Sequence, residues 1–277
     1  IASFTNIILD LLFIPVLKMG IAGAAIATDI SQLLSAVLCM LYLMRVNESY
    51  KVVLRKIRIH KTVAIRIIQV GVPTAIQNTV ISFANVLVQA SVNSYGALAM
   101  AGFAAYIKID GFNILPVMSF SMAATTFSGQ NYGAGKYKRM KQSVATCLLL
   151  DFIATLLVTA VLLLGGKYLL QLFTTDPEVI EIGLKIIRLI VPSYVLFIFI
   201  EILSSTLRGM GNVLVPMIVT CCGVCVLRIL WIFLVVPHWP GVSSILLCYP
   251  ISWGLTTILF LLYYYKEQKK FFRTHQE

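Results

Sequence analysis

The amino-acid sequence predicts an all-helical, polytopic membrane protein, and three observations support this fold class. Hydrophobic residues make up 59% of the chain and charged residues only 12%, too few to build a water-facing surface. The apolar residues gather into eight stretches long enough to cross a bilayer as helices. A hairpin pattern occurs twice, 222 residues apart, at Asn6–Ser31 and Arg228–Ser252, which indicates a repeated architecture.

The eight predicted spans follow one another with short connections. A helix rises 1.5 Å per residue, so about 20 apolar residues cross the hydrocarbon core. We place the spans at 1–17, 21–45, 66–94, 97–127, 141–165, 180–207, 213–236 and 242–265. We expect four parts: a helix pair (1–46), an amphipathic cytoplasmic linker (47–65), a six-helix bundle (66–265) and a cytoplasmic tail (266–277).

The loop charges orient the spans. Sixteen Lys and Arg residues lie in one set of loops and two, Lys18 and Lys167, in the other. Basic residues next to membrane ends stay in the cytoplasm, so we expect a cytoplasmic C-terminus and location in the cell membrane. The net charge of +11 is then a consequence of topology, and nucleic acid is not an expected partner. The linker alternates cationic and aliphatic residues, as in a helix lying on an anionic membrane surface.

The sequence does not favour an enzyme. The three histidines lie in loops or in the tail, and the six cysteines have no histidine partners at metal-binding spacing. The segment from Gly129 to Lys136 has the look of a phosphate-binding loop. However, five residues separate Gly129 from Gly135, and Tyr137 stands where Ser or Thr must bind magnesium. We therefore expect neither catalysis nor a cofactor.

The first hairpin carries the polar residues that predict a cation site. Asn6 and Asp10 are four residues apart, hence on one helix face. If the hairpin turns near residue 19, Asp10 faces Thr28 at about 13 Å from the turn, near the bilayer midplane. The side-chain oxygens of Asn6, Asp10 and Thr28 are suitable ligands for Na⁺, and the Asp10 carboxylate could instead bind a proton. The alternative is a hydrogen-bond cluster that only holds the two helices of the hairpin together. In the second hairpin Arg228 and Ile232 stand at the positions of Asn6 and Asp10.

The six-helix segment offers a second group of polar candidates. Lys108 and Asp110 lie mid-span beside Gly111 and Pro116, where a kink would open polar groups to a cavity. Because they are two residues apart, they cannot face one direction, and pairing with other helices is the structural alternative. Tyr106 and Trp253 are aromatic candidates for binding flat cationic compounds.

Two loops resemble the signature of a known family. The run Ser128–Lys136 (SGQNYGAGK), followed by Arg139, closely resembles the signature loop of multidrug and toxin extrusion (MATE) transporters. Leu207–Asn212 (LRGMGN) with Pro216 is similar to the later loop of that family. The resemblance covers the whole chain. It implies that the eight helices correspond to spans five to twelve of a twelve-span, two-lobe repeat transporter, with the N-terminal lobe incomplete.

The resemblance implies secondary active export of organic, often cationic, solutes by alternating access, in antiport with H⁺ or Na⁺. In the family an N-terminal site combines an Asp on span one with Asn, Asp and Thr on spans five and six, which Asn6, Asp10 and Thr28 match. Some members also use acids on spans seven and ten; Glu201 lies on span ten at a different spacing from the loop. We expect the substrate path to contain Tyr106, Lys108, Asp110, Glu201 and Trp253.

The residues of the predicted spans do not favour two other classes of function. A lipid-linked saccharide flippase of the same broad superfamily would need several buried arginines, whereas only Lys108 and Arg228 are deep in the predicted spans. A channel would need rings of like polar residues, and no such pattern is evident. The expected partners are membrane lipids and small organic solutes, and we expect a monomer.

Overall fold

The described part of the chain is helical and contains no strand, as predicted. A computed structural model describes residues 1–48 and 50–274, with side chains described through Glu267. Seven of the described helices are long and apolar enough to cross a membrane. The chain divides into two compact units, Ile1–Ala64 and Ile65–Glu277.

The first unit is a helical hairpin. Helix α1 (Ala2–Leu11) continues into a π-helical turn (Leu12–Val16), and α2 (Gly20–Arg45) packs back against it. Lys18 and Gly20 both have positive φ, +53° and +58°, which reverses the chain within a few residues. The helix Ala2–Val16 is shorter than the seven long helices, so the eight expected spans become seven long helices and a short one.

The linker contains little helix among its described residues. A single 3-10 turn (Leu54–Lys56) is flanked by extended backbone at Val53 and Ile57, and helix resumes at Lys61. The amphipathic helix that we expected from Tyr50 onward is therefore wrong for this stretch. The β-branched residues of the linker alternate with charged residues at a period nearer two than 3.6, which does not favour a helix. β-Branched side chains also lose conformational freedom in a helix.

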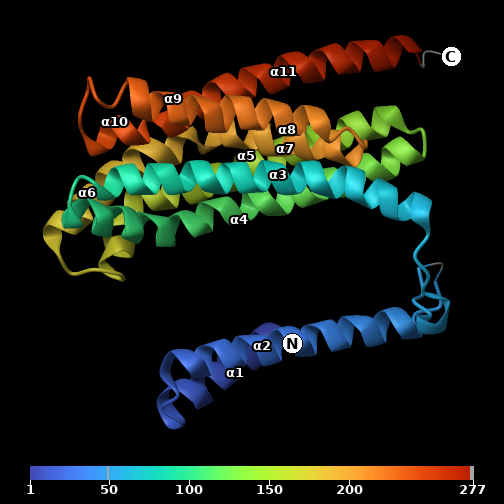
Figure 1. Ribbon diagram of the computed structural model, residues 1–277, viewed down its shortest axis with the longest axis horizontal. Coiled ribbons are helices and arrows are strands. Elements are labelled where there is room, and N and C mark those ends of the chain that lie inside the picture. Colours follow the sequence, from blue (N-terminus) through green and yellow to red (C-terminus); the bar gives the residue numbers. More distant parts are fainter. Residues whose placement is uncertain (49, 275–277) are drawn as a thin grey trace. The chain divides into compact units, whose positions relative to one another are not determined.

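Six of the seven long apolar passes belong to the second unit, whose helices are drawn in Figure 1. Helix α4 packs against α5, α6 and α7, and α7 also packs against α11. The elements are α3 (Lys61–Asn93), α4 (Ala97–Gly133), α5 (Tyr137–Gln171), α6 (Pro177–Ile190), η3 (Val191–Ser193), α7 (Tyr194–Gly209), α8 (Leu214–Thr220), η4 (Cys221–Val226), α9 (Leu227–Leu234), α10 (Val242–Leu246) and α11 (Cys248–Thr274).

Three passes of this unit are interrupted, though not where the sequence suggested. The pass α6–α7 is broken by a 3-10 turn containing Pro192, the pass α8–α9 by the π turn Cys221–Val226, and α10 is separate from α11. By contrast, α4 continues as one helix through Gly111 and Pro116 and past the predicted end at residue 127 to Gly133. Gly111 and Pro116, where we expect a kink, therefore do not end the helix.

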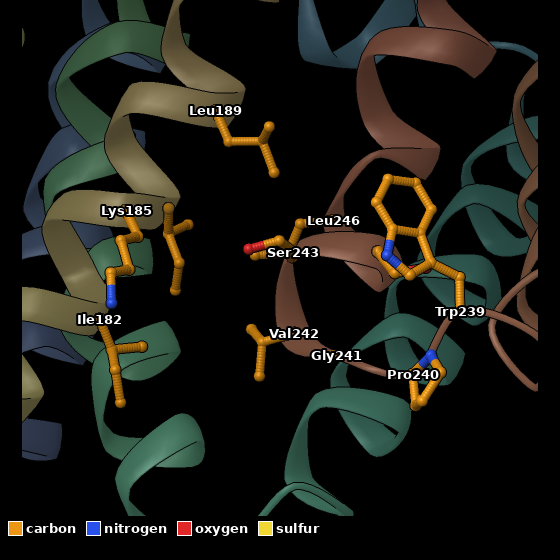
Figure 2. A pocket seen from close by; sticks show the side chains of 11 residues that line it. Ile182, Lys185, Leu189, Trp239, Pro240, Gly241, Val242, Ser243 and Leu246 are labelled. Atoms are coloured by element: carbon orange, nitrogen blue, oxygen red, sulfur yellow. The ribbon is translucent and has the colours of Figure 1, made fainter.

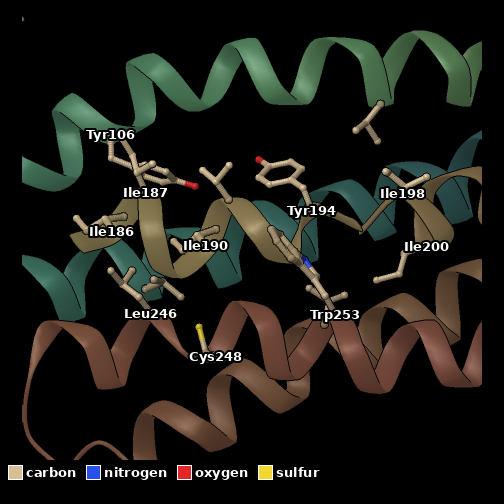
Figure 3. Packing of buried hydrophobic residues seen from close by; sticks show 14 of the residues in the cluster. Tyr106, Ile186, Ile187, Ile190, Tyr194, Ile198, Ile200, Leu246, Cys248 and Trp253 are labelled. Atoms are coloured by element: carbon tan, nitrogen blue, oxygen red, sulfur yellow. The ribbon is translucent and has the colours of Figure 1, made fainter. Parts of the chain in front are cut away.

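The core of the second unit combines apolar packing with buried polar groups. Ile187, Ile190 and Ile198 are fully buried between α4 and α11, as Figure 3 shows. Large apolar side chains elsewhere on the helices are exposed, as a surface facing lipid tails would be. Several polar side chains are nevertheless completely buried: Asn113, Asp151, Thr155, Ser204, Ser205, Thr206 and Thr256. Buried polar groups inside apolar helices often belong to functional sites, so we look for the candidate site among them.

Candidate functional site

In the first unit, two of the predicted cation ligands have buried polar atoms without a partner. The Asn6 amide nitrogen and one Asp10 carboxylate oxygen, Oδ1, are buried and form no hydrogen bond with the described residues. Both side chains project from α1, one turn apart. Burying an oxygen without a hydrogen-bond partner costs free energy of folding. We therefore expect this face of α1 to contact a ligand or another polar group.

Thr28 is placed differently from these two residues. It lies on α2, is exposed within the unit, and donates its hydroxyl hydrogen to the Ala24 carbonyl at 2.9 Å. This bond to the preceding helical turn is the ordinary way in which a threonine satisfies itself inside a helix. The Thr28 oxygen keeps a free lone pair, but its hydroxyl hydrogen is bonded to its own helix and not to Asp10.

In the second unit, Asp110 is held by two tyrosines. The Tyr106 hydroxyl donates to Asp110 Oδ1 and the Tyr194 hydroxyl to Asp110 Oδ2, each at 2.8 Å. Tyr106 lies one turn before Asp110 on α4, whereas Tyr194 begins α7. Figure 3 shows the hydroxyl ends of the two rings turned toward each other. Both carboxylate oxygens are therefore bonded, which fixes the acid in one orientation.

Tyr194 also belongs to a cluster of four aromatic rings from α7 and α11, and we call them the aromatic cage: Tyr194, Phe197, Tyr249 and Trp253. The Trp253 ring centre lies 5.2 Å from that of Tyr194, 4.9 Å from Phe197 and 5.5 Å from Tyr249. Trp253 is 4% exposed, and its indole nitrogen has no hydrogen-bond partner among the described residues. The cage thus combines ring faces packed in the core with an N–H donor that has no partner among the described residues.

Arg228 is the buried cation of this region. It lies on α9 and is 3% exposed. Its guanidinium carbon is 4.1 Å from the Tyr249 ring centre and 5.8 Å from that of Trp253. It also donates to Asn85 Oδ1 at 2.8 Å and to the Ser252 hydroxyl at 3.3 Å. Its charge is therefore already engaged by ring faces and neutral oxygens.

The five residues expected in the substrate path do not all meet. Tyr106 and Asp110 bond directly, and Trp253 reaches them through Tyr194. Lys108 is exposed on another face of α4. Glu201 lies seven residues beyond Tyr194 on α7, about 10 Å along the helix.

Glu201 belongs to a separate polar group near the end of α7. Its Oε2 lies 3.4 Å from the Ser121 hydroxyl and 3.9 Å from the Arg208 guanidinium. The same Arg208 nitrogen donates to Ser205 Oγ at 2.6 Å, and the Ser205 and Ser121 hydroxyls lie 2.6 Å apart. Arg208 is thus bonded more closely to Ser205 than to Glu201.

The two signature loops meet where α4 and α7 cross. Gly209 packs so closely on α4 that a methyl group added there would lie 2.5 Å from the Thr125 carbonyl oxygen. On the facing helix, a methyl group on Gly129 would lie 3.1 Å from the Gly209 carbonyl oxygen. Gly135 and Gly211, in the loops that follow, have φ of +69° and +85°. The glycines of both loops therefore serve close packing and turning, not phosphate binding.

A cavity of about 370 Å³ lies in another part of the second unit. Figure 2 shows Ile182, Lys185 and Leu189 of α6 on one side and the segment from Trp239 to Leu246 on the other. Neither Asp110 nor Glu201 lines it. A cavity with a single cation and mostly apolar walls offers little for a cationic solute, so we base the candidate site on the acids.

Sequence reasoning missed part of the site. Asp151, which is fully buried on α5, is not among the predicted site residues. The same signal that indicates Asp110 also applies to Asp151, because a carboxylate inside an apolar span costs free energy and is usually functional. Asn85 and Ser252 were also missed, because neutral side chains become notable only once Arg228 is seen beside them. Tyr106 is four residues from Asp110, a detectable helical spacing, but Tyr194 is 84 residues away.

Comparison with known proteins agrees with this architecture. The chain is similar to the "Probable multidrug resistance protein NorM" of Thermotoga maritima, 30% identical over 250 residues, covering 86% of this chain and 52% of the relative. "Probable multidrug resistance protein YoeA" of Bacillus subtilis is 26% identical over 258 residues, covering 91% and 56%. The chain spans about half the length of the curated relatives it matches.

Solved structures show the same fold. An outward-facing multidrug resistance MATE family transporter of the MOP superfamily matches with a TM-score of 0.86 at 22% identity, covering 95% of this chain and 59% of that one. A MOP superfamily transporter from Pyrococcus furiosus matches with a TM-score of 0.87 at 22% identity, covering 95% and 59%. The MatE family model matches residues 73–234, more than half of the chain. The chain therefore belongs to the MATE family of transporters, which are not enzymes.

Proposed function

We propose that the protein is a secondary active exporter that exchanges a monovalent cation, H⁺ or Na⁺, for an organic and often cationic solute. Membership of a transporter family supports the class of function, and curated relatives carry names that refer to multidrug resistance or multidrug export. Alternating access between two lobes is the motion expected of such repeat transporters. The chain's own residues supply the argument for coupling and for solute binding.

The observation that carries the coupling proposal is the unpartnered oxygen of Asp10. This carboxylate oxygen is buried on an apolar helix, and the unpartnered Asn6 amide lies one turn away. A proton or Na⁺ bound there would neutralise the carboxylate and satisfy the oxygen at once. Thr28, across the hairpin, would contribute its free lone pair as a neutral ligand.

The solute is proposed to bind beside Asp110 and the aromatic cage. A flat organic cation would gain from ring faces and from a nearby carboxylate, and the free Trp253 indole N–H would donate to an oxygen of the solute. Tyr106 and Tyr194 hold the acid in place for this contact. Lys108 and Glu201 are proposed to act outside this contact, at the edges of the path.

Arg228 bears on the alternative function, a lipid-linked saccharide flippase. Such a protein would use free buried cations to bind phosphate groups. Arg228 is instead stacked on Tyr249 and hydrogen-bonded to Asn85 and Ser252. Its geometry supports a structural role for the cation and favours the exporter.

We further propose location in the cell membrane with the C-terminus in the cytoplasm. The basis is the excess of Lys and Arg in the loops on that side of the predicted spans. Lipids and small solutes are the proposed partners, and the proposed working unit is a monomer. Labelling of single cysteines placed in the loop at Lys138 and in the loop at Lys167, with a membrane-impermeant reagent, tests this orientation.

The test of coupling is Asp10→Asn in the intact protein, reconstituted into vesicles. Because the amide keeps the side-chain volume but not the charge, cation-driven efflux of a fluorescent organic cation should fall at least about tenfold, while the melting temperature changes little. Glu181→Gln, an exposed acid on α6, is the matched control and should transport as wild type. Wild-type efflux by Asp10→Asn would reduce Asp10 to a structural role.

A further inference from the structure

The cavity of about 370 Å³ between α6 and α10 has no role in the proposed transport. Its volume falls within the range of small-molecule binding sites, which begins at about 300 Å³. Ile186 and Leu246, each 1% exposed, line it from the buried core. Half-buried apolar side chains make up much of the remaining wall: Ile182, Leu189 and Val242. An apolar space of this size favours a hydrocarbon chain over water or an ion.

One polar side chain in the cavity wall is buried without a partner. Ser244 is 2% exposed, and its hydroxyl has no hydrogen-bond partner among the described residues. Its backbone carbonyl, by contrast, accepts a bond from the Trp231 indole N–H at 2.8 Å, which holds the residue in place. A buried hydroxyl without a partner costs free energy, and an oxygen atom of a bound ligand would satisfy it. Ser244 therefore indicates a ligand that carries oxygen acceptors next to its hydrocarbon.

Lys185 supplies the charge of the cavity wall. Figure 2 shows it on α6, across the cavity from the segment that carries Ser243. Its ammonium lies 2.8 Å from a Glu181 carboxylate oxygen, and the two side chains are 63% and 69% exposed. An ion pair this exposed contributes little to stability, so the ammonium can exchange the carboxylate for a phosphate oxygen, which is an equally charged acceptor. The cavity thus combines apolar space with a cation that faces solvent.

The cavity lies at the end of the membrane passes, where lipid headgroups meet lipid tails. Helices α6 and α10 lie at the same end of the second unit, opposite the C-terminal end of α11 (Figure 1), and the proposed topology places this end outside the cytoplasm. Trp239, in the loop between α9 and α10, lines the cavity and is 57% exposed. Tryptophan is enriched at membrane interfaces, and lysine reaches toward headgroups there. The Gly241 N–H donates to the Tyr95 hydroxyl at 2.9 Å, which fixes the same loop.

We propose that this cavity binds one anionic phospholipid of the surrounding membrane. An acyl chain occupies the apolar space between α6 and α10, the phosphate accepts a bond from the Lys185 ammonium, and an ester oxygen accepts one from the Ser244 hydroxyl. The exposed ring of Trp239 packs beside the chain at the interface. A free phosphate lacks the hydrocarbon that the apolar wall favours. A zwitterionic lipid carries its own cation, which competes with Lys185 for the phosphate.

The site rests on the proposed membrane location, but it does not depend on export. All the residues that line the cavity belong to the second unit, and neither Asp10 nor Asp110 is among them. Lipid binding is measured at equilibrium, without a cation gradient or a transported solute. Absence of binding therefore leaves the efflux test of Asp10→Asn unaffected, and wild-type efflux by Asp10→Asn leaves the lipid site unaffected.

Thermal unfolding of the purified intact protein in a neutral detergent tests the site. Dioleoylphosphatidylglycerol at about a hundred times its Kd should raise the melting temperature of the wild type by on the order of 5 °C. Lys185→Gln should raise the lipid concentration needed for half of this effect about tenfold, because one charge-assisted bond is lost. Val242→Phe fills the apolar space and should abolish the rise. Arg188→Gln is the matched control, because it removes an exposed cation of α6 that does not line the cavity.

Two further ligands identify what the cavity recognises. Dioleoylphosphatidylcholine should need about tenfold more lipid for the same effect, and glycerol 3-phosphate, a headgroup without chains, should leave the melting temperature unchanged. A response to glycerol 3-phosphate, equal responses to the two lipids, or a full response in both Lys185→Gln and Val242→Phe would overturn the proposal. If Val242→Phe fails to fold, Leu189→Phe fills the same space from α6. Native mass spectrometry then counts the phospholipid that stays bound to each variant.

Discussion

Asp10 in the first unit and Asp110 in the second are both carboxylates inside apolar helices, yet their surroundings are opposite. Both oxygens of Asp110 accept short bonds from tyrosine hydroxyls, whereas Asp10 has a buried oxygen with no partner in the part of the chain that the structure describes. A saturated acid is fixed and presents its charge to a binding region. An unsaturated acid is free to take up a cation and release it. Burial alone therefore does not distinguish the two acids, whereas the number of their hydrogen bonds does.

Removing each acid entirely should have the largest effect and should affect the two units differently. Asp110→Ala leaves two buried tyrosine hydroxyls without an acceptor, so the free energy of unfolding should fall by about 3 kcal/mol. Asp10→Ala removes an oxygen that has no partner, and the loss should stay within about 1 kcal/mol. Thermal unfolding of both variants in the same detergent measures the difference. Equal losses would show that the two acids are not held differently.

The role of the tyrosines can be sharpened by removing one hydroxyl at a time. Tyr194→Phe and Tyr106→Phe should each lower the free energy of unfolding by about 1 kcal/mol, because each deletes one bond to Asp110. The double variant should lose less than the sum if Asp110 becomes neutral once both bonds are gone. A double-mutant cycle of melting temperatures provides the measurement, and strict additivity would argue against a shared acceptor.

The smallest expected effect concerns Thr28. Thr28→Val should change the free energy of unfolding by less than about 0.5 kcal/mol, because the hydroxyl is exposed and bonded to its own helix. Efflux should fall by about threefold if the Thr28 oxygen is a ligand of the coupling cation. Thr5→Val, a second helical threonine bonded one turn back to Ile1, is the control and should leave efflux unchanged. Equal efflux in both variants would exclude Thr28 from the site.

The membrane passes were predictable because hydropathy and length determine them, and their interruptions were not. Pro116 predicts a kink, and α4 continues as helix through it, whereas no sequence signal predicts the π turn at Cys221–Val226. The predicted span ends at residue 127, just before the signature run that contains Gly129 and Gly133. In the structure both are helical, and Gly129 lies in helix because it packs against Gly209. Tertiary contact of this kind is invisible to local sequence patterns.

The candidate site was predictable only where its residues are neighbours in the sequence. Asn6 with Asp10, and Tyr106 with Asp110, are helical pairs four residues apart that a periodic reading can find. The bonds from Tyr194 to Asp110 and from Arg228 to Asn85 join residues 84 and 143 positions apart. Such pairings depend on which helices pack together, and that is determined by the whole bundle.

The helix crossing at Gly129 and Gly209 restricts how the six-helix unit can change shape. A methyl group on Gly209 would collide with the Thr125 carbonyl oxygen, so the two backbones are already in contact. Helices this close cannot slide lengthwise by a residue, because the next side chain would have to pass through the same gap. We therefore expect α4, which carries Asp110, and α7, which carries Glu201, to move together as one rigid body. We expect conformational change within the unit to occur in the passes that contain irregular turns. The pass α8–α9, with its π turn, is the first of these.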